Sequence, residues 1–136
     1  MVMTTRQVQV VKNSWKIFQD ISPLLVGEVF YGKLFMSYPR LRHLFTTPIE
    51  EQSKKLVEML SIIVARLDRP DEFKSEVRQL AIRHVAYGVK PEHYKAVGQA
   101  LLWTLGQGLG KDWTEETKQA WTACYEELAK MMMAEK

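Results

Sequence analysis

Cysteine is nearly absent from this 136-residue chain, which contains only Cys124. A single cysteine excludes an intramolecular disulfide and a zinc cluster built from cysteines. Long apolar runs are also missing, because the longest uncharged stretch, residues 96–110, is too short to cross a bilayer. Residues 1–12 lack the apolar centre of a signal peptide. We therefore expect a cytoplasmic protein with no membrane association.

No block of basic residues stands out, although the net charge is +3 and the pI is about 9.0. Scattered lysines and arginines are weak support for nucleic-acid binding, so no nucleic-acid partner is expected. Hydrophobic residues make up 46% and charged residues 26% of the chain, which is ordinary for a globular protein. The length suits one domain over residues 1–136, as a monomer or a weak homodimer.

Alternating strand patterns are absent too, and helical spacing of apolar residues replaces them. The sequence predicts an all-α protein with about seven helices joined by short turns. Thr4 or Thr5 would cap the first helix, and a second would begin at Pro23. The remaining predicted segments are residues 39–45, 48–67, 71–87 and 91–109, followed by a last helix that Thr114 caps. A capping box at residues 47–50 would begin the helix over 48–67, and glycines 108 and 110 would end the helix over 91–109.

One glycine lies inside the second predicted helix. Gly27 costs about 1 kcal/mol there relative to alanine, which indicates a close approach by the backbone of a crossing helix. Tyr31 is one helical turn further on and lies on the same face.

A histidine ends an apolar stripe on the helix predicted before Pro91. Phe73, Val77, Leu80 and His84 share one helical face. Gly88 then supplies a residue that can end a helix. On this spacing alone, a core histidine satisfied by its neighbours is favoured over a metal ligand.

Four sets of residues, in chain order, change that interpretation. They are Phe30-Tyr31-x-x-Leu34-Phe35-x-x-x-Pro39-x-x-x-x-x-Phe45; Gln52-Ser53-x-x-Leu56; Arg83-His84-x-x-x-Gly88-Val89 followed by His93-Tyr94-x-x-Val97-Gly98; and Ala120-Trp121 with Tyr125. Together they resemble the globin family, specifically bacterial single-domain haemoglobins and the globin part of flavohaemoglobins. The resemblance covers nearly the whole chain and implies a globin fold around a haem pocket.

The resemblance implies that His84 is the proximal ligand of the iron in haem b. The second ring nitrogen of His84 would donate to a carbonyl near Leu80 or to the Tyr94 hydroxyl, since such a bond fixes the tautomer of a haem-ligating histidine. The other residues implied to contact haem are Phe45, Leu56, Leu80, Val89, Tyr94, Val97 and Lys55. His43 is interpreted as a surface residue, and Cys124 as a buried apolar filler. His93 matches a histidine that related bacterial globins place at the haem edge, and a surface position is equally compatible.

Tyr31 and Gln52 match the positions of distal residues, beside Leu56. A phenol aimed at O2 bound to iron would form a charge-assisted hydrogen bond worth roughly 1.5–3 kcal/mol. Gln52 donates through its amide but binds iron poorly, so the sixth coordination position is predicted to be open. Two plain alternatives remain: a core tyrosine bonded to a carbonyl, and an exposed glutamine in a fraying helix turn.

Three functions are compatible with these features. The first is reversible binding and transport of O2, with NO and CO as further ligands. The second is a nitric oxide dioxygenase that uses Tyr31 and Gln52 and a separate flavoprotein reductase, because the sequence ends at Lys136 without a reductase domain. The third is a haem-free helical interaction or sensor module. The glutamate that some relatives place on the last helix would align near Lys136, with Glu135 one residue out of register, which argues against peroxidase-like chemistry.

Overall fold

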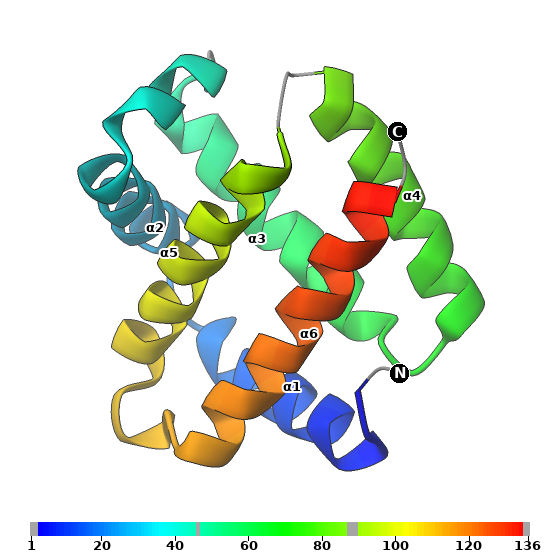
Figure 1. The fold of residues 1–136 in the computed structure, drawn as a ribbon. Coiled ribbons are helices and arrows are strands. Elements are labelled where there is room, and N and C mark those ends of the chain that lie inside the picture. Colours follow the sequence, from blue (N-terminus) through cyan, green and yellow to red (C-terminus); the bar gives the residue numbers. More distant parts are fainter. Residues whose placement is uncertain (1–2, 46, 87–89, 135–136) are drawn as a thin grey trace.

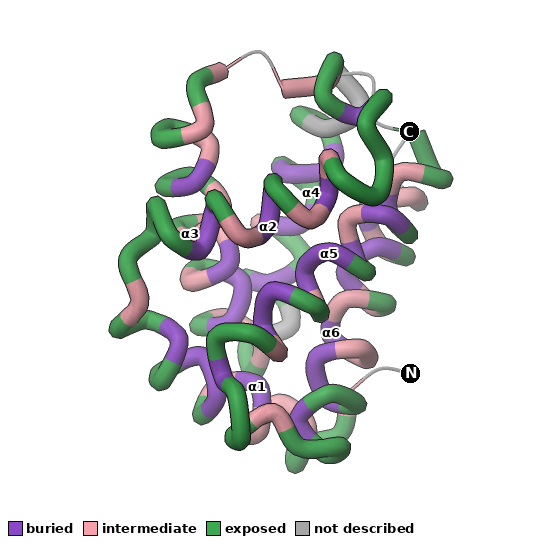
Figure 2. Tube along the Cα trace, turned by 90° about the vertical axis from the view of Figure 1, so that its left-hand side faces the viewer, coloured by how far each residue is buried: buried purple, intermediate pink, exposed green. Residues whose placement is uncertain are grey.

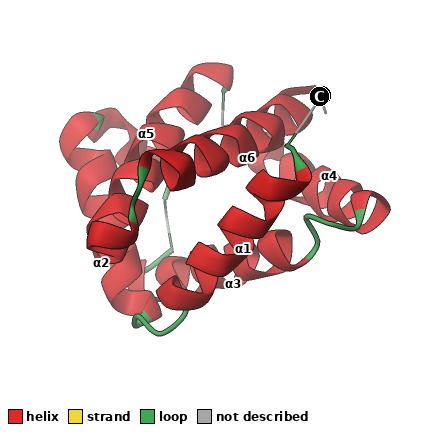
Figure 3. Ribbon diagram, turned by 90° about the horizontal axis from the view of Figure 1, so that it is seen from below, coloured by secondary structure: helices red, strands yellow, loops and turns green. Residues whose placement is uncertain are grey.

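The computed structural model describes residues 3–45, 47–86 and 90–134, and the side chains of these residues except 70, 84–86 and 134. The described residues form six α-helices and two short 3₁₀ helices, and they contain no strand (Figure 3). The elements are α1 (Thr5–Phe18), α2 (Pro23–Ser37), η1 (Pro39–Leu44), α3 (Ile49–Ala65), α4 (Pro70–Ala86), α5 (Pro91–Leu109), η2 (Gly110–Asp112) and α6 (Glu115–Ala134). The prediction of an all-α fold is confirmed.

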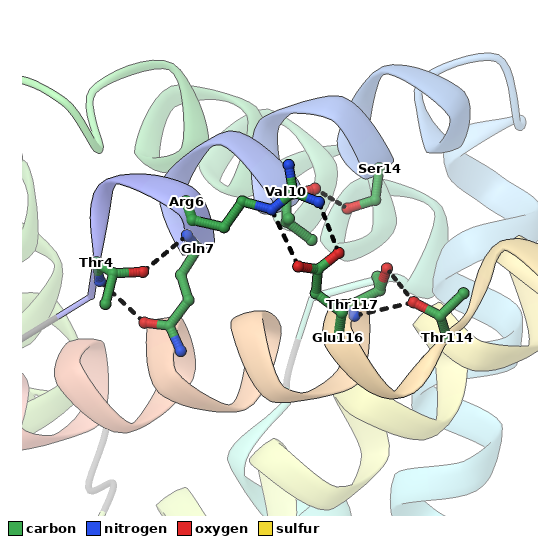
Figure 4. A network of polar contacts seen from close by, with 8 residues as sticks. All are labelled: Thr4, Arg6, Gln7, Val10, Ser14, Thr114, Glu116 and Thr117. Carbon is green, nitrogen blue, oxygen red and sulfur yellow. Dashed lines mark hydrogen bonds and ion pairs between the residues drawn. The ribbon is translucent and has the colours of Figure 1, made fainter.

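Most helix ends lie where the sequence places them. The Thr4 hydroxyl accepts a hydrogen bond from the Gln7 backbone N–H at 3.0 Å, and the Gln7 side-chain oxygen accepts one from the Thr4 N–H at 2.9 Å (Figure 4). This reciprocal pair satisfies two backbone donors at the start of α1. The Thr114 hydroxyl accepts from the Thr117 N–H in the same way at the start of α6.

Two of the predicted helix signals are wrong. The capping box at residues 47–50 does not form, because Pro48 itself occupies the position before α3 and no side chain caps this end. Of the two glycines expected to end α5, Gly108 lies inside the helix and Gly110 follows it. Gly110 has a φ of 54°, a backbone conformation that glycine adopts without a steric penalty.

The helices pack around a shared interior. The long α6 crosses α1 (Figure 1), and α2 lies between α3 and α5 (Figure 2). Buried residues face inward along each helix, and the exposed residues form the outer turns (Figure 2). The turn at residues 66–69 joins α3 to α4, and the two helices diverge away from it (Figure 1).

The buried side chains form two clusters. The larger cluster joins α1, α2, α3, α5 and α6, with Trp121 and Leu34 among its most deeply buried members. The smaller one joins α4 to the end of α3, the start of α5 and the second half of α6; its buried members are Ile63, Phe73, Val77, Leu80, Ala81, Tyr94, Leu128, Ala129 and Met132. Phe73, Val77 and Leu80 of the apolar stripe predicted on α4 therefore face the interior.

Polar contacts fasten α1 to its neighbours. The indole N–H of Trp121 donates to the Ser14 hydroxyl at 2.8 Å, which satisfies a buried donor inside the core. At the surface, the Arg6 guanidinium donates two hydrogen bonds to Glu116 on α6 (Figure 4). No helix within the described part of the chain is long and apolar enough to cross a membrane.

Candidate functional site

Tyr31 lies on the inner face of α2 and is the most unusual polar side chain of the interior. Only 5% of its surface is exposed. Its hydroxyl donates to the backbone carbonyl of Gln52 on α3, at an oxygen–oxygen distance of 3.5 Å. O–H···O bonds in proteins are usually about 2.7–2.8 Å long. Among the described residues, the phenol is therefore a buried group with one long, weak acceptor. A carbonyl partner is what the plain alternative of a core tyrosine expects, and the distal role of Tyr31 stays a prediction.

Three aromatic rings surround the Tyr31 ring. Phe30 and Phe45 meet it edge-on, with ring centroids 4.9 and 5.3 Å away, and Phe35 stacks on it at 5.9 Å. Phe35 and Phe45 also contact one another, at 5.4 Å. We call Tyr31 and these three rings the aromatic cluster. It fixes the ring plane of Tyr31, since aromatic pairs prefer such stacked and edge-on arrangements.

Phe35 belongs to the motif that carries the resemblance, but no role was predicted for it from the sequence. The signal was available, because Phe35 is one helical turn after Tyr31 and must lie beside it on α2. Phe45 is partly buried just after η1, and its contact with Tyr31 places it beside the candidate distal residues.

Burial raises the pKa of the Tyr31 phenol to about 12, because the interior disfavours the charged phenolate. The hydroxyl is thus protonated at any physiological pH. A group at this position acts as a hydrogen-bond donor and not as a base.

The close helix approach predicted at Gly27 is confirmed. A Cβ atom placed on Gly27 would lie 1.6 Å from the Ser53 hydroxyl oxygen and 2.9 Å from the Ser53 Cα atom. Ser53 has no exposed surface, and its hydroxyl donates to the Ile49 carbonyl at 2.7 Å. Only a glycine lets α2 and α3 approach this closely.

The other candidate distal residues lie on α3. Gln52 and Leu56 are partly buried and Lys55 is exposed. Gln52 belongs to the first turns of α3, and its backbone carbonyl accepts the hydrogen bond from Tyr31. The role predicted for its side chain stays a prediction.

The candidate proximal residues lie on α4 and α5. Leu80 and Tyr94 are buried in the smaller cluster, and Val97 packs against the larger one. Burial raises the pKa of Tyr94. The Tyr125 hydroxyl on α6 donates to the Tyr94 carbonyl, and its ring covers Gly98, which ties the start of α5 to α6.

Several predicted residues lie outside the described part of the structure. The backbone of His84 belongs to the last turn of α4, but its side chain is not among those described. Gly88, Val89, Glu135 and Lys136 lie outside the described residues altogether. The roles predicted for these residues stay predictions.

The remaining histidines and the cysteine have structural positions. His43 is exposed, as expected. The Nδ1 atom of His93 accepts a hydrogen bond from the Lys90 backbone N–H at 2.9 Å, so this partly buried ring caps α5. Cys124 is buried as predicted, and burial raises the pKa of its thiol to about 12.

Iron porphyrin is compatible with the residues that the structure describes. Haem brings four nitrogen ligands and needs one from the protein. Among the described residues no cluster of three histidine, cysteine, aspartate or glutamate side chains is present. The Tyr31 hydroxyl is a buried donor with a long hydrogen bond to the Gln52 carbonyl, which suits a ligand that gains negative charge on binding.

These features define the class of protein: an all-helical fold in which a protonated phenol is held inside an aromatic cluster, where two helices cross. A family model described as "Globin" matches residues 28–132. The chain belongs to the globin family.

Similar proteins extend over almost the whole chain. An uncharacterized globin-like protein of Aquifex aeolicus is 30% identical over 132 residues, which cover 97% of this chain and 93% of that protein. The solved structure of an engineered carbene transferase made from a putative nitric oxide dioxygenase of Rhodothermus marinus has a TM-score of 0.86. It is 28% identical, and the match covers 97% of this chain and 92% of that one. The globin fold is thereby confirmed.

Flavohemoproteins also match, but only in part. The flavohemoprotein of Vibrio cholerae is 28% identical over 135 residues, which are 97% of this chain and 34% of that protein. The chain thus spans about a third of the length of this relative.

The pKa of Tyr31 leads to a testable prediction. In a spectrophotometric titration of the phenols, Tyr31→Phe should remove absorbance change from the late phase near pH 12, because burial opposes formation of the phenolate. Loss of amplitude from an early phase near pH 10 instead would contradict the burial of the hydroxyl.

Proposed function

We propose that this globin binds haem b through His84 and holds O2 reversibly opposite that histidine, with NO and CO as further ligands. Ferrous haem supplies the metal that binds the diatomic molecule, and the protein supplies the donors and the dry surroundings. Membership of the globin family and the match to flavohemoproteins support the cofactor. The Tyr31 hydroxyl supports the ligand.

One observation carries the proposal: the Tyr31 phenol is buried, and among the described residues its hydroxyl has only the 3.5 Å hydrogen bond to the Gln52 carbonyl. Turning the Tyr31 O–H away from the Gln52 carbonyl toward a bound ligand costs little free energy, because a hydrogen bond of 3.5 Å is weak. The new bond would gain strength from the partial negative charge of bound O2 and from the low polarity of the aromatic cluster. The hydrogen bond to the ligand is therefore stronger than the bond to the Gln52 carbonyl that it replaces, so the ligand dissociates more slowly.

Gln52 and Leu56 complete the proposed distal side. The Gln52 amide donates a second hydrogen bond from α3, while Leu56 and Phe45 exclude water. The exposed Lys55 is available to pair with a haem carboxylate at the surface. On the proximal side, Leu80, Tyr94 and Val97 would pack around the His84 ring, with Val89 following.

The first prediction concerns O2 release. Tyr31→Phe should raise the O2 dissociation rate about tenfold or more, because it removes one charge-assisted hydrogen bond. The rate is measured by displacing O2 with CO in a stopped-flow instrument. The control is Tyr38→Phe, which removes an exposed hydroxyl that donates to Gln99, and it should leave the rate unchanged. Equal rates in the wild type and Tyr31→Phe would contradict the proposed distal role.

The second prediction concerns the iron ligand. His84→Ala should abolish stable haem retention, or leave a pigment whose spectrum added imidazole restores, because the variant lacks the axial nitrogen. His43→Ala, at an exposed histidine, is the matched control and should retain haem normally. A His84→Ala protein with an unchanged Soret band would show that another side chain binds the iron.

A second function, nitric oxide dioxygenase, is favoured by the likeness to the Rhodothermus marinus protein, whose description is a putative enzyme of that activity. The same donors, Tyr31 and Gln52, would hold O2 for reaction with NO to give nitrate. The iron would then need an electron from a separate flavoprotein reductase.

Turnover distinguishes the two functions. With NADH, NO, O2 and an added flavoprotein reductase, an enzyme should consume many equivalents of NO and form nitrate, whereas an O2 carrier should stop after one. A colourless protein from cells well supplied with haem would contradict both functions and favour the haem-free interaction module.

A further inference from the structure

We propose that the crossing of α2 and α3 at Gly27 and Ser53 sets the rate of O2 release, by fixing how far the Tyr31 hydroxyl lies from Gln52. This inference rests on the proposed function and adds two positioning residues to it. Neither residue is among the predicted ligand contacts.

The two contacts lie side by side on the same helix pair. Gly27 precedes Tyr31 by one turn of α2, and Ser53 directly follows Gln52 on α3. Gly27 meets Ser53 with no room for another atom, and Tyr31 reaches the Gln52 carbonyl at the limit of hydrogen-bonding distance. The close crossing therefore determines the spacing of the distal donors.

Neither helix can adapt easily to a change in the spacing between α2 and α3. A methyl group at Gly27 would overlap the Ser53 hydroxyl oxygen and Cβ atom, at 1.6 and 2.2 Å, so α3 must move away from α2. Ser53 cannot easily turn aside, because it is fully buried and its hydroxyl is bonded to Ile49. The aromatic cluster holds the Tyr31 ring, so the phenol cannot follow α3 by changing its orientation.

The chain offers a matched control in the same helix. A Cβ atom at Gly32 would meet nothing within 4 Å. Gly32→Ala therefore adds the same methyl group to α2 without changing the crossing.

The test measures the O2 dissociation rate of the haem-loaded protein in a double-mutant cycle. Gly27→Ala should raise the rate about fivefold in the wild-type background, because water that enters between the separated helices competes with O2 for the Tyr31 hydroxyl. It should change the rate less than about twofold in the Tyr31→Phe background, because the effect passes through Tyr31. Gly32→Ala should leave the rate unchanged. Equal increases in both backgrounds would overturn the proposal, since a general loosening of the pocket acts without Tyr31.

A double variant, Gly27→Ala with Ser53→Gly, tests the proposal even if the single variant Gly27→Ala does not fold. We call it the exchange variant. It removes the overlaps at 1.6 and 2.2 Å, and only the Ser53 backbone, with its α-carbon 2.9 Å from the new methyl group, must still adjust. The exchange should return the dissociation rate to within about twofold of the wild type. A folded exchange variant that releases O2 as fast as Tyr31→Phe would overturn the proposal.

A second measurement needs no haem. The phenol assigned by difference to Tyr31 should titrate at lower pH in Gly27→Ala than in the wild type, because water reaches the hydroxyl when the helices separate. An unchanged titration would overturn the proposal. If Tyr31→Phe alone has no effect on O2 release, the proposed function fails; if only the coupling to Gly27 is missing, this inference fails alone.

Discussion

The interior of this globin depends on the closeness of α2 and α3 at Gly27 and Ser53. A glycine inside a helix lowers the stability of that helix. Here Gly27 allows an approach of the two helices that no other residue permits. Tyr31, one turn later, extends its phenol to α3 as a consequence. The packing constraint and the polar site therefore have one origin.

Three other aromatic residues of the core form shorter hydrogen bonds through their polar groups than Tyr31 does. Trp121 donates to Ser14 at 2.8 Å, Trp15 donates to Ser61 at 3.2 Å, and Tyr125 donates to the Tyr94 carbonyl. These bonds join one helix to another and specify how the helices pack. Tyr31 instead keeps a donor with a weak partner inside an apolar cluster, which is the chemistry that a transient, partly negative ligand requires.

Family membership does not determine what this chain does. Globin folds serve several reactions, and the function depends on the side chains of the site. The matched region is 34% of the flavohemoprotein relative, so the whole activity of that protein does not transfer with the fold. For the two proposed functions, the distinction between O2 binding and NO conversion would depend on electron supply, because the same proposed distal donors would serve both.

Sequence alone determined the helices, most of their ends, and the family. Apolar spacing, prolines at helix starts and the Thr4 cap act over a few residues, so local rules are sufficient. Gly27 also indicated the helix crossing. The capping box at residues 47–50 failed because one proline displaced the helix start, a choice that local patterns leave open.

Only the tertiary structure decided which partners meet at the site. The 3.5 Å approach of Tyr31 on α2 to Gln52 on α3, and the edge-on contact of Phe45 with the Tyr31 ring, depend on how separate elements pack against one another. These contacts depend on every side chain at the interface, so no spacing in the sequence contains them.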